Sequence, residues 1–270
     1  MDNKSPIILT EKPHLGISSC CMSCPVRYNG KGFNMTTHLG REKQDFIWTP
    51  VCPESQSGLG VMRDPIHISG PDGSAVWTGE AGIRNRLGQD LTEQVKAGSM
   101  ECLAVLKRAG IKAFVYMDGS PTCGVYRTTL KKQSRGKPPG VFGSLLFDQG
   151  FFLIPALDLQ SPLRWWDWRR RLLAWLWLQD VSLSSRAELY AVWYRLKFIC
   201  QELDNVQART LGHDIAGWKG NLTQEQADAF RLQVGDMLRQ PSNSAKMMNS
   251  LWKNYSHYRK VTGQNLPEIN

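Results

Sequence analysis

The sequence lacks any long apolar run and any sign of an export signal. Nowhere in its 270 residues do about 18 uncharged apolar residues follow one another, so no segment is suited to cross a membrane. The opening MDNKSPIILTEKPH has no apolar stretch of signal-peptide length. We therefore expect a cytoplasmic protein with no membrane partner. The hydrophobic share of 41% is still ample for a packed core.

Acidic residues are the scarcer charge. The chain has 24 Asp and Glu against 33 Lys and Arg, which gives a net charge of +9. Such an excess favours an anionic partner, either nucleic acid or a phosphorylated small molecule, although a basic surface without any partner gives the same charge. The seven cysteines are not expected to form disulfides, because the cytosol keeps thiols reduced. Some of them are candidate ligands of a metal or cluster.

Short apolar runs bounded by Gly, Pro, Ser or Asp predict buried strands. Three of these runs lead directly into loops that carry a cysteine, and they cover residues 15–19, 46–51 and 111–117. An amphipathic helix is expected between the second and third runs. Asp90 would be its N-cap with Glu93 completing a capping box, and Gly110 would end it.

Strands that alternate with a helix predict an α/β fold with a largely parallel sheet and flanking helices. Ligands bind such sheets at the carboxyl ends of the strands, where Cys20, Cys52 and Cys123 would emerge together. A further apolar run at 151–157 would close this domain, which we assign to residues 1–160. A basic loop rich in Gly and Pro is expected at 131–140, near an anionic ligand.

The composition changes after about residue 160. Eight of the ten tryptophans lie beyond that point and glycine becomes sparse. We therefore assign residues 161–270 to an all-helical accessory domain that binds substrate or RNA. The expected helices cover residues 163–179, 184–204, 223–239 and 243–260.

The first of these helices, WWDWRRRLLAWLWLQ at 165–179, permits two interpretations. Its aromatic and Arg side chains would suit stacking on bases and contacts with phosphates. Tryptophans at helical spacing are more often packed in a core, however, and we favour a core helix here. A helix lying on a membrane surface is the third and least favoured interpretation.

Three thiolates alone would leave one coordination position of a metal or cluster open, which implies chemistry at that position. A closed structural site would need a fourth ligand. Cys21 and Cys24 are spaced as C-x-x-C and could supply it, or they could form a separate redox or zinc pair. Cys102 and Cys200 lie on apolar stripes of expected helices and are interpreted as buried, inert thiols.

The segments around these thiols resemble the thiouracil and thiouridine desulfidase family, TudS, over about residues 7–155. The resemblance does not extend to the helical tail. It is carried by four ordered motifs, which are Ser18-Ser19-Cys20, Val26-Arg27-Tyr28-Asn29-Gly30, Cys52-Pro53-Glu54 with Gly58-Leu59-Gly60 and Arg63, and Ser120-Pro121-Thr122-Cys123-Gly124.

The resemblance implies a 4Fe-4S cluster bound by only three cysteines, carried over to Cys20, Cys52 and Cys123. Its fourth iron would accept sulfur from a thiocarbonyl. Glu54 would be the general base that activates water, and Ser120 would hydrogen-bond or protonate the reacting ring. The C=S bond would be hydrolysed without an external reductant, so the enzyme would be of the hydrolase or lyase type.

Arg27, Tyr28 and Asn29 would bind substrate in this interpretation. The family usually has Asp where this chain has Asn29, and an amide can hydrogen-bond but cannot carry the proton or charge of a carboxylate. Cys21 and Cys24 are a second departure, because the neighbours of the first ligand are usually apolar or glycine.

The sequence as a whole therefore predicts a desulfidase that acts on a thiolated pyrimidine: 4-thiouridine, its monophosphate, 4-thiouridine in transfer RNA, or thiouracil. The positive charge favours the nucleotide over the free base. Two alternatives stay open at this point. One is a cluster- or zinc-containing RNA-binding protein without turnover, and the other is a redox enzyme or sulfur carrier that uses the cluster as a relay.

Overall fold

The computed structural model describes residue 9 and residues 11–125 and 139–263 of the chain. The chain divides into two compact units, the first covering Leu9–Trp166 and the second beginning at Asp167. Each unit is described here by itself. The basic loop expected at 131–140 lies outside the described residues except for its last two positions.

The first unit is built on a four-stranded sheet in which every pair of neighbours is parallel. This confirms the α/β class and the largely parallel sheet expected from the sequence. The expected strands agree with the observed ones to within two residues. In the order in which they lie across the sheet, the strands are β2 (Ile47–Val51), β1 (His14–Ser18), β5 (Ala113–Tyr116) and β6 (Phe152–Pro155).

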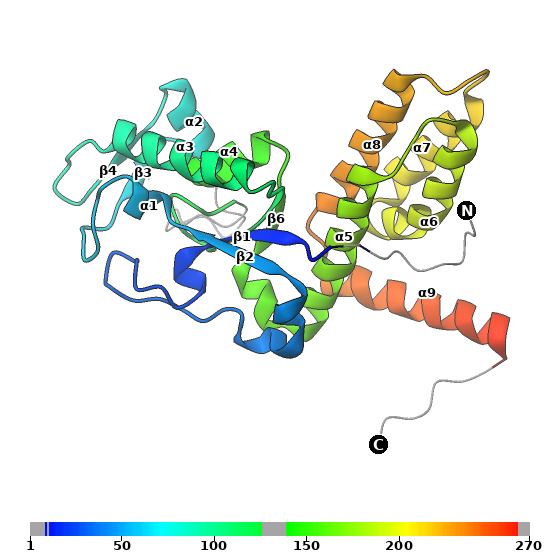
Figure 1. The fold of residues 1–270 in the computed structure, drawn as a ribbon, viewed down its shortest axis with the longest axis horizontal. Coiled ribbons are helices and arrows are strands. Elements are labelled where there is room, and N and C mark those ends of the chain that lie inside the picture. The colour runs from blue at the N-terminus through cyan, green and yellow to red at the C-terminus, as the bar shows by residue number, and fades with distance from the viewer. Residues whose placement is uncertain (1–8, 10, 126–138, 264–270) are drawn as a thin grey trace. The chain divides into compact units, whose positions relative to one another are not determined.

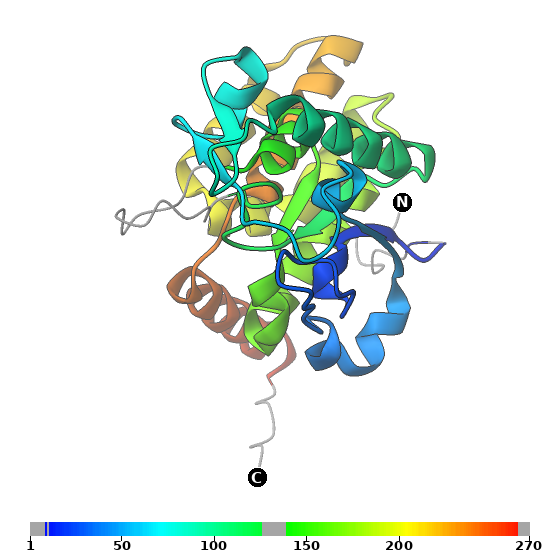
Figure 2. The ribbon, with the colours of Figure 1, turned by 90° about the vertical axis from the view of Figure 1, so that its left-hand side faces the viewer.

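The strand order places a topological switch point between β1 and β5. The chain passes from β1 to β2 on one side, and then crosses over to β5 on the other side of β1. Gly16 in β1 is accordingly paired with both Thr49 and Phe114. In open parallel sheets such a reversal leaves a crevice at the carboxyl ends of the strands. Figure 2 turns this end of the sheet toward the viewer.

Helices cover both faces of the sheet (Figure 1). On one face lie α3 (Thr92–Arg108) and α4 (Val141–Asp148), and on the other lie the 3-10 helices η2 (Thr37–Asp45) and η3 (Ala156–Gln160). A side chain at Gly16 would overlap Leu106 of α3 and the ring of Phe114. Glycine at this position therefore lets α3 pack closely on the central strand.

The N-terminus of α3 differs from the expected capping box. Its N-cap is Leu91, which makes no side-chain cap, rather than Asp90. Asp90 instead accepts a 2.9 Å hydrogen bond from the backbone N–H of Thr92 from outside the helix. Glu93 forms an exposed ion pair with Lys96 rather than bonding back to the cap. The local residue types were correct but the cap was placed one residue too early.

Several short elements of the first unit were not predicted. A 3-10 turn, η1 (Ser19–Cys21), follows β1, and a single-turn helix, α1 (Pro53–Gln56), follows β2. An antiparallel pair, β3 (His67–Ser69) and β4 (Gly82–Arg84), encloses α2 (Gly73–Thr78). These elements are three to six residues long, which is too short for a hydrophobic period to be recognised.

The second unit is helical, as expected. Its elements are α5 (Pro162–Asp180, which begins in the first unit), α6 (Arg186–Leu203), α7 (Asn205–Gly217), α8 (Gln224–Arg239) and α9 (Ser244–Thr262). The capping box that opens α8 is formed by Thr223 and Gln226, and Asn243 caps α9. Helix α7 was missed, because only Ala208, Leu211 and Ile215 form its buried stripe.

Helix α5 is a core helix, which agrees with the favoured interpretation of its tryptophans. Trp168 is buried, and the guanidinium of Arg171 lies 3.9 Å from the centroid of its ring. Arg171 is itself fully buried, forms an ion pair with Asp167 at 2.7 Å and donates to the carbonyl of Leu238 at the end of α8. These contacts place the Trp168 ring and the Arg171 guanidinium in the core, where they cannot meet a nucleic acid.

Among the residues that the structure describes, no helix is both long and apolar enough to cross a membrane.

Close packing of α4 against the Cys123 loop yields a test of the fold. The N–H of Gly143 donates to the carbonyl of Thr122 at 3.0 Å, and a Cβ at this position would overlap the carbonyl oxygen of Gly124. We expect Gly143→Ala to destabilise the protein by about 1–3 kcal/mol, measured by thermal unfolding. Gly217→Ala is the matched control, because no atom lies within 4 Å of its new methyl group. Equal melting temperatures for the two variants would contradict this packing.

Candidate functional site

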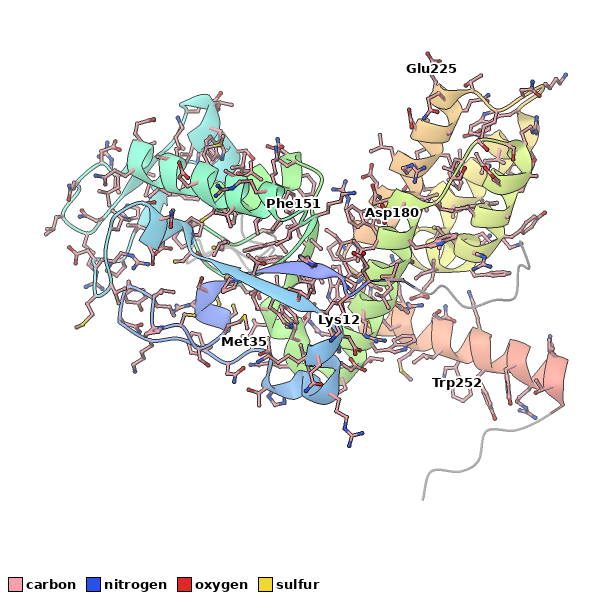
Figure 3. All side chains as sticks on the ribbon, in the orientation of Figure 1. Lys12, Met35, Phe151, Asp180, Glu225 and Trp252 are labelled. Atoms are coloured by element: carbon pink, nitrogen blue, oxygen red, sulfur yellow. The ribbon has the colours of Figure 1, made fainter. Side chains whose placement is uncertain are left out.

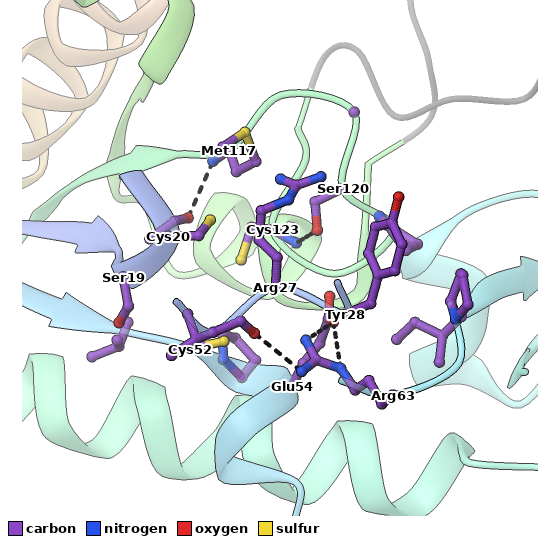
Figure 4. Close-up of a pocket in the computed structure, with 18 of the residues that line it drawn as sticks. Ser19, Cys20, Arg27, Tyr28, Cys52, Glu54, Arg63, Met117, Ser120 and Cys123 are labelled. Carbon is purple, nitrogen blue, oxygen red and sulfur yellow. Dashed lines mark hydrogen bonds and ion pairs between the residues drawn. The ribbon is translucent and has the colours of Figure 1, made fainter. Parts of the chain in front are cut away.

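Three cysteines meet at the carboxyl end of the sheet. Cys20 lies in η1 directly after β1, Cys52 follows β2, and Cys123 lies in the loop after β5. All three line one pocket, and Figure 4 shows their thiols grouped around the same part of it. The parallel strands thus bring together three thiols that are far apart in the sequence, as expected.

The loop that carries Cys123 is held by hydrogen bonds within the protein. The hydroxyl oxygen of Ser120 accepts the backbone N–H groups of Thr122 at 3.2 Å and Cys123 at 3.1 Å. The first turn of α4 donates to the same loop, from Val141 to the carbonyl of Pro121 and from Phe142 to that of Thr122. The Ser120 oxygen accepts the bonds from Thr122 and Cys123, and a hydroxyl in this arrangement still carries one O–H proton that it can donate.

Glu54 lies on the first turn of α1, two residues after Cys52. Pro53 occupies the first helical position, where its missing N–H costs nothing. Arg63 forms an ion pair with the Oε2 atom of Glu54, and the hydroxyl of Thr122 donates to the Oε1 atom at 2.9 Å. Both oxygens of this carboxylate therefore have fixed partners.

Arg27 and Tyr28 line the pocket beside Cys20, but Asn29 does not. The guanidinium of Arg27 lies 5.0 Å from the centroid of the Phe33 ring. Its Nε atom is buried and has no hydrogen-bond partner within the described part of the chain. Asn29 is exposed, and its side-chain oxygen accepts the backbone N–H of Lys31 at 3.2 Å. The amide at 29 thus belongs to an exposed turn.

The electrostatic surroundings of the three thiols differ. A hydrogen bond with the Cys21 thiol lowers the pKa of Cys20, and the charge of Arg27 lowers it further, whereas burial acts in the opposite direction. Burial raises the pKa of Cys52 and, to a much larger extent, that of Cys123. Cys20 is therefore the most readily ionised of the three thiols in the absence of a metal.

The other four cysteines lie outside this pocket, and all seven are free thiols. Cys21 is fully buried, and burial raises the pKa of Cys102 and of Cys200 to about 12. Among the described residues, no three His, Cys, Asp or Glu side chains are grouped closely enough to hold a single metal ion.

Two residues at the site were given no role from the sequence. Arg63 was noted only as part of a motif, and Thr122 only as a neighbour of Cys123. Their contacts with Glu54 join positions 9 and 68 residues apart. No local sequence pattern predicts such contacts. The one available signal was that Arg63 and Glu54 belong to the same motif.

Comparisons with known proteins agree on the first unit. A family model described as 2-thiouracil desulfurase matches residues 15–157. An uncharacterized protein of Bacillus subtilis (strain 168), YbbK, is 31% identical over 153 residues, which are 54% of this chain and 98% of YbbK. A solved structure described as the [4Fe-4S]-dependent thiouracil desulfidase TudS is 25% identical. It covers 53% of this chain and 91% of its own, with a TM-score of 0.43.

The different thiol environments predict an order of chemical modification. In protein prepared without iron, we expect iodoacetamide to react at Cys20 several-fold faster than at Cys52, because the alkylated species is the thiolate. Both side chains are half-buried. Arg27→Gln should slow modification of Cys20 alone. Peptide mass spectrometry measures both rates, and faster reaction at Cys52 would contradict the assignment.

Proposed function

The chain belongs to the 2-thiouracil desulfurase family, and we propose from this membership that it is a non-redox desulfidase of the cytoplasm. Its reaction would be hydrolysis of the C=S bond of a thiolated pyrimidine. The oxygen of water bonds to the ring carbon, the carbon–sulfur bond breaks, and sulfur leaves as sulfide, so no oxidant or reductant is consumed. The observation that carries the proposal is the meeting of three thiols and a carboxylate in one pocket.

The donor set at this pocket fits an iron–sulfur cluster. Cys20, Cys52 and Cys123 are soft thiol ligands, and they lie near enough for Cys20 and Cys52 each to perturb the pKa of Cys123. A 4Fe-4S cluster binds its thiolates through different irons, so its ligands need not converge on one point as those of a single metal ion must. When bound through these three residues, the cluster would supply a thiophilic iron with an open position.

Glu54 would act as the general base of this reaction. Its carboxylate lines the pocket that the thiols share, and it would take a proton from the attacking water. Ser120 lines the same pocket, and its free O–H proton would be donated to the reacting ring. These two roles place a proton acceptor and a proton donor around one substrate.

Arg27 and Tyr28 would bind the rest of the substrate. The guanidinium of Arg27 lines the pocket and suits a phosphate group, since guanidinium groups recognise phosphate through several donors. Tyr28 lies beside it on the pocket wall and offers an aromatic face to a pyrimidine. We therefore propose 4-thiouridine monophosphate as the first substrate to test, ahead of 4-thiouridine and thiouracil.

The proposed activity is tested directly under anaerobic conditions. Protein reconstituted with iron and sulfide is mixed with 4-thiouridine monophosphate, and loss of the thiocarbonyl absorbance is followed together with release of uridine monophosphate and sulfide. We expect both products without added reductant, and we expect Cys52→Ala to lose bound iron and activity together. Turnover only with an added reductant would contradict a non-redox reaction, and protein that binds no iron would contradict the cluster.

Replacing the proposed base tests the role of Glu54 separately from cluster binding. Glu54→Gln keeps the size of the side chain but removes the proton acceptor. We expect kcat to fall by about 10²–10⁴-fold. Iron and labile sulfide per chain should match those of the wild-type protein. A kcat within about threefold of wild type would exclude Glu54 as the base.

We also propose that the helical unit binds RNA and so brings 4-thiouridine in transfer RNA to the site. The support is an aromatic ridge on α6, formed by Tyr190, Tyr194 and Phe198. The first two rings stack at 6.3 Å, and Phe198 is 66% exposed. Lys197 lies 4.4 Å from the Tyr194 ring centroid. Exposed rings interleaved with cations suit stacking on unpaired bases beside phosphates.

Helix α9 carries further exposed groups of the same kinds. Its sequence contains Lys and Arg but no Asp or Glu. Trp252 is 62% exposed on this helix, where Figure 3 labels its side chain. The guanidinium of Arg259 lies 5.8 Å from the centroid of the Tyr255 ring. The positive charge of α9 adds to the attraction for a polyanion.

The RNA proposal predicts a loss that depends on the substrate. We expect the double variant Tyr194→Ala, Phe198→Ala to lower kcat/KM for 4-thiouridine-containing transfer RNA by at least about tenfold, from lost stacking. Its kcat/KM for 4-thiouridine monophosphate should not change. Leu232→Ala removes an equally exposed apolar side chain from α8 and serves as the control. An equal effect on both substrates would exclude the ridge as an RNA contact.

A further inference from the structure

We propose that Arg63 and Thr122 are positioning residues that fix the Glu54 carboxylate in the orientation its role as base requires. This inference rests on the proposed function. It assigns roles to two residues that contact the carboxylate of Glu54 directly and would act on the reaction through it.

Arg63 is the more extensively bound of the two. Its side chain is 7% exposed, and that of Glu54 is 17% exposed. Both Nε and Nη2 of Arg63 donate to the same oxygen, Oε2 of Glu54. Its Nη1 atom donates to the carbonyls of Val26 at 3.0 Å and Gly60 at 2.6 Å. The planar guanidinium thereby holds the carboxylate against two further segments of backbone.

The hydrogen bond from Arg63 to the carbonyl of Val26 connects Glu54 with the segment that carries Arg27. Val26 immediately precedes Arg27, which lines the pocket and is proposed to bind the substrate phosphate. Arg63 therefore ties the segment that would hold the substrate to the carboxylate that would activate water. Such a link fixes the position of the base relative to the reacting ring. A misplacement of about 1 Å can cost about 10²-fold in rate.

Thr122 orients the other side of the carboxylate. Its side chain is fully buried, and its hydroxyl donates to Oε1 of Glu54. Its backbone is fixed by Ser120 and by the first turn of α4. Thr122 also directly precedes Cys123. The position of the base is thus set by the same loop that carries the third thiol.

The two residues leave the carboxylate able to accept a proton. An ionised carboxylate has about four acceptor positions on its two oxygens. Arg63 provides two donors to Oε2, whereas Thr122 provides one donor to Oε1. One acceptor position on Oε1 is then left for water. Removing either positioning residue would leave Glu54 chemically intact but held on one oxygen only.

Thr122→Val is the first variant to make, because it removes the hydroxyl while keeping a β-branched side chain of similar shape. We expect kcat with 4-thiouridine monophosphate to fall about 10- to 100-fold, the range of one hydrogen bond to a charged group. KM, iron and labile sulfide per chain, and the absorption spectrum of the bound cluster should stay within twofold of wild type. Thr122→Ser returns the hydroxyl and should restore most of kcat.

A control variant removes a threonine hydroxyl from an exposed position outside the pocket. Thr78→Val removes a hydroxyl that donates to the carbonyl of Ala75 within α2, outside the pocket. It should leave kcat unchanged. Arg63→Lys keeps the positive charge but cannot donate two hydrogen bonds from a planar guanidinium to Glu54, whereas Arg63→Gln loses the charge as well. We therefore expect the kcat of Arg63→Lys to lie between those of the wild-type protein and Arg63→Gln.

Each outcome decides the inference. A wild-type kcat in Thr122→Val overturns it, and so do equal losses in Thr122→Val and Thr122→Ser. A loss of kcat that follows the loss of bound iron would make Thr122 a structural residue of the cluster loop, which also overturns it. If the wild-type protein releases no sulfide from any thiolated pyrimidine, the proposed function itself fails and the inference falls with it.

Discussion

The site depends on the parallel alignment of the strands. Parallel strands all end at the same edge of a sheet, so residues that directly follow them must be neighbours however far apart they lie in the chain. Here β1 is central, with β2 on one side and β5 on the other. Cys20, Cys52 and Cys123 each follow one of these strands. An antiparallel arrangement would have sent at least one of the thiols to the opposite edge.

The sequence was most informative where one physical effect dominated. Strands β5 and β6 are buried on both faces, so their residues form continuous apolar runs that stand out from the polar loops around them. Helix α5 shows the opposite case. Its mixture of rings and cations has two sound interpretations, and only the burial of Arg171 and Trp168 decides between them. Helix α7 was missed because its buried side is formed by three residues rather than by a wide apolar stripe.

At the site, local motifs were predictable and long-range partners were not. Cys52 and Glu54 lie two residues apart, and Ser120 and Cys123 share a loop, so the motifs of the family resemblance named them together. The partners of Glu54 are Arg63, from the loop that follows α1, and Thr122, from the loop that follows β5. Their contact with Glu54 depends on how those two loops fold. Asn29 shows a further limit, because its position within a motif did not indicate that its side-chain oxygen accepts the backbone N–H of Lys31 in an exposed turn.

Strand β2 contains a proline that limits further growth of the sheet. This strand lies at the edge of the sheet and contains Pro50, which is exposed. A proline is tolerated at an edge because its missing N–H then faces away from the neighbouring strand. An incoming strand would find no donor at that position. Growth of the sheet by addition of a strand from another chain is therefore discouraged at this edge, two residues before Cys52.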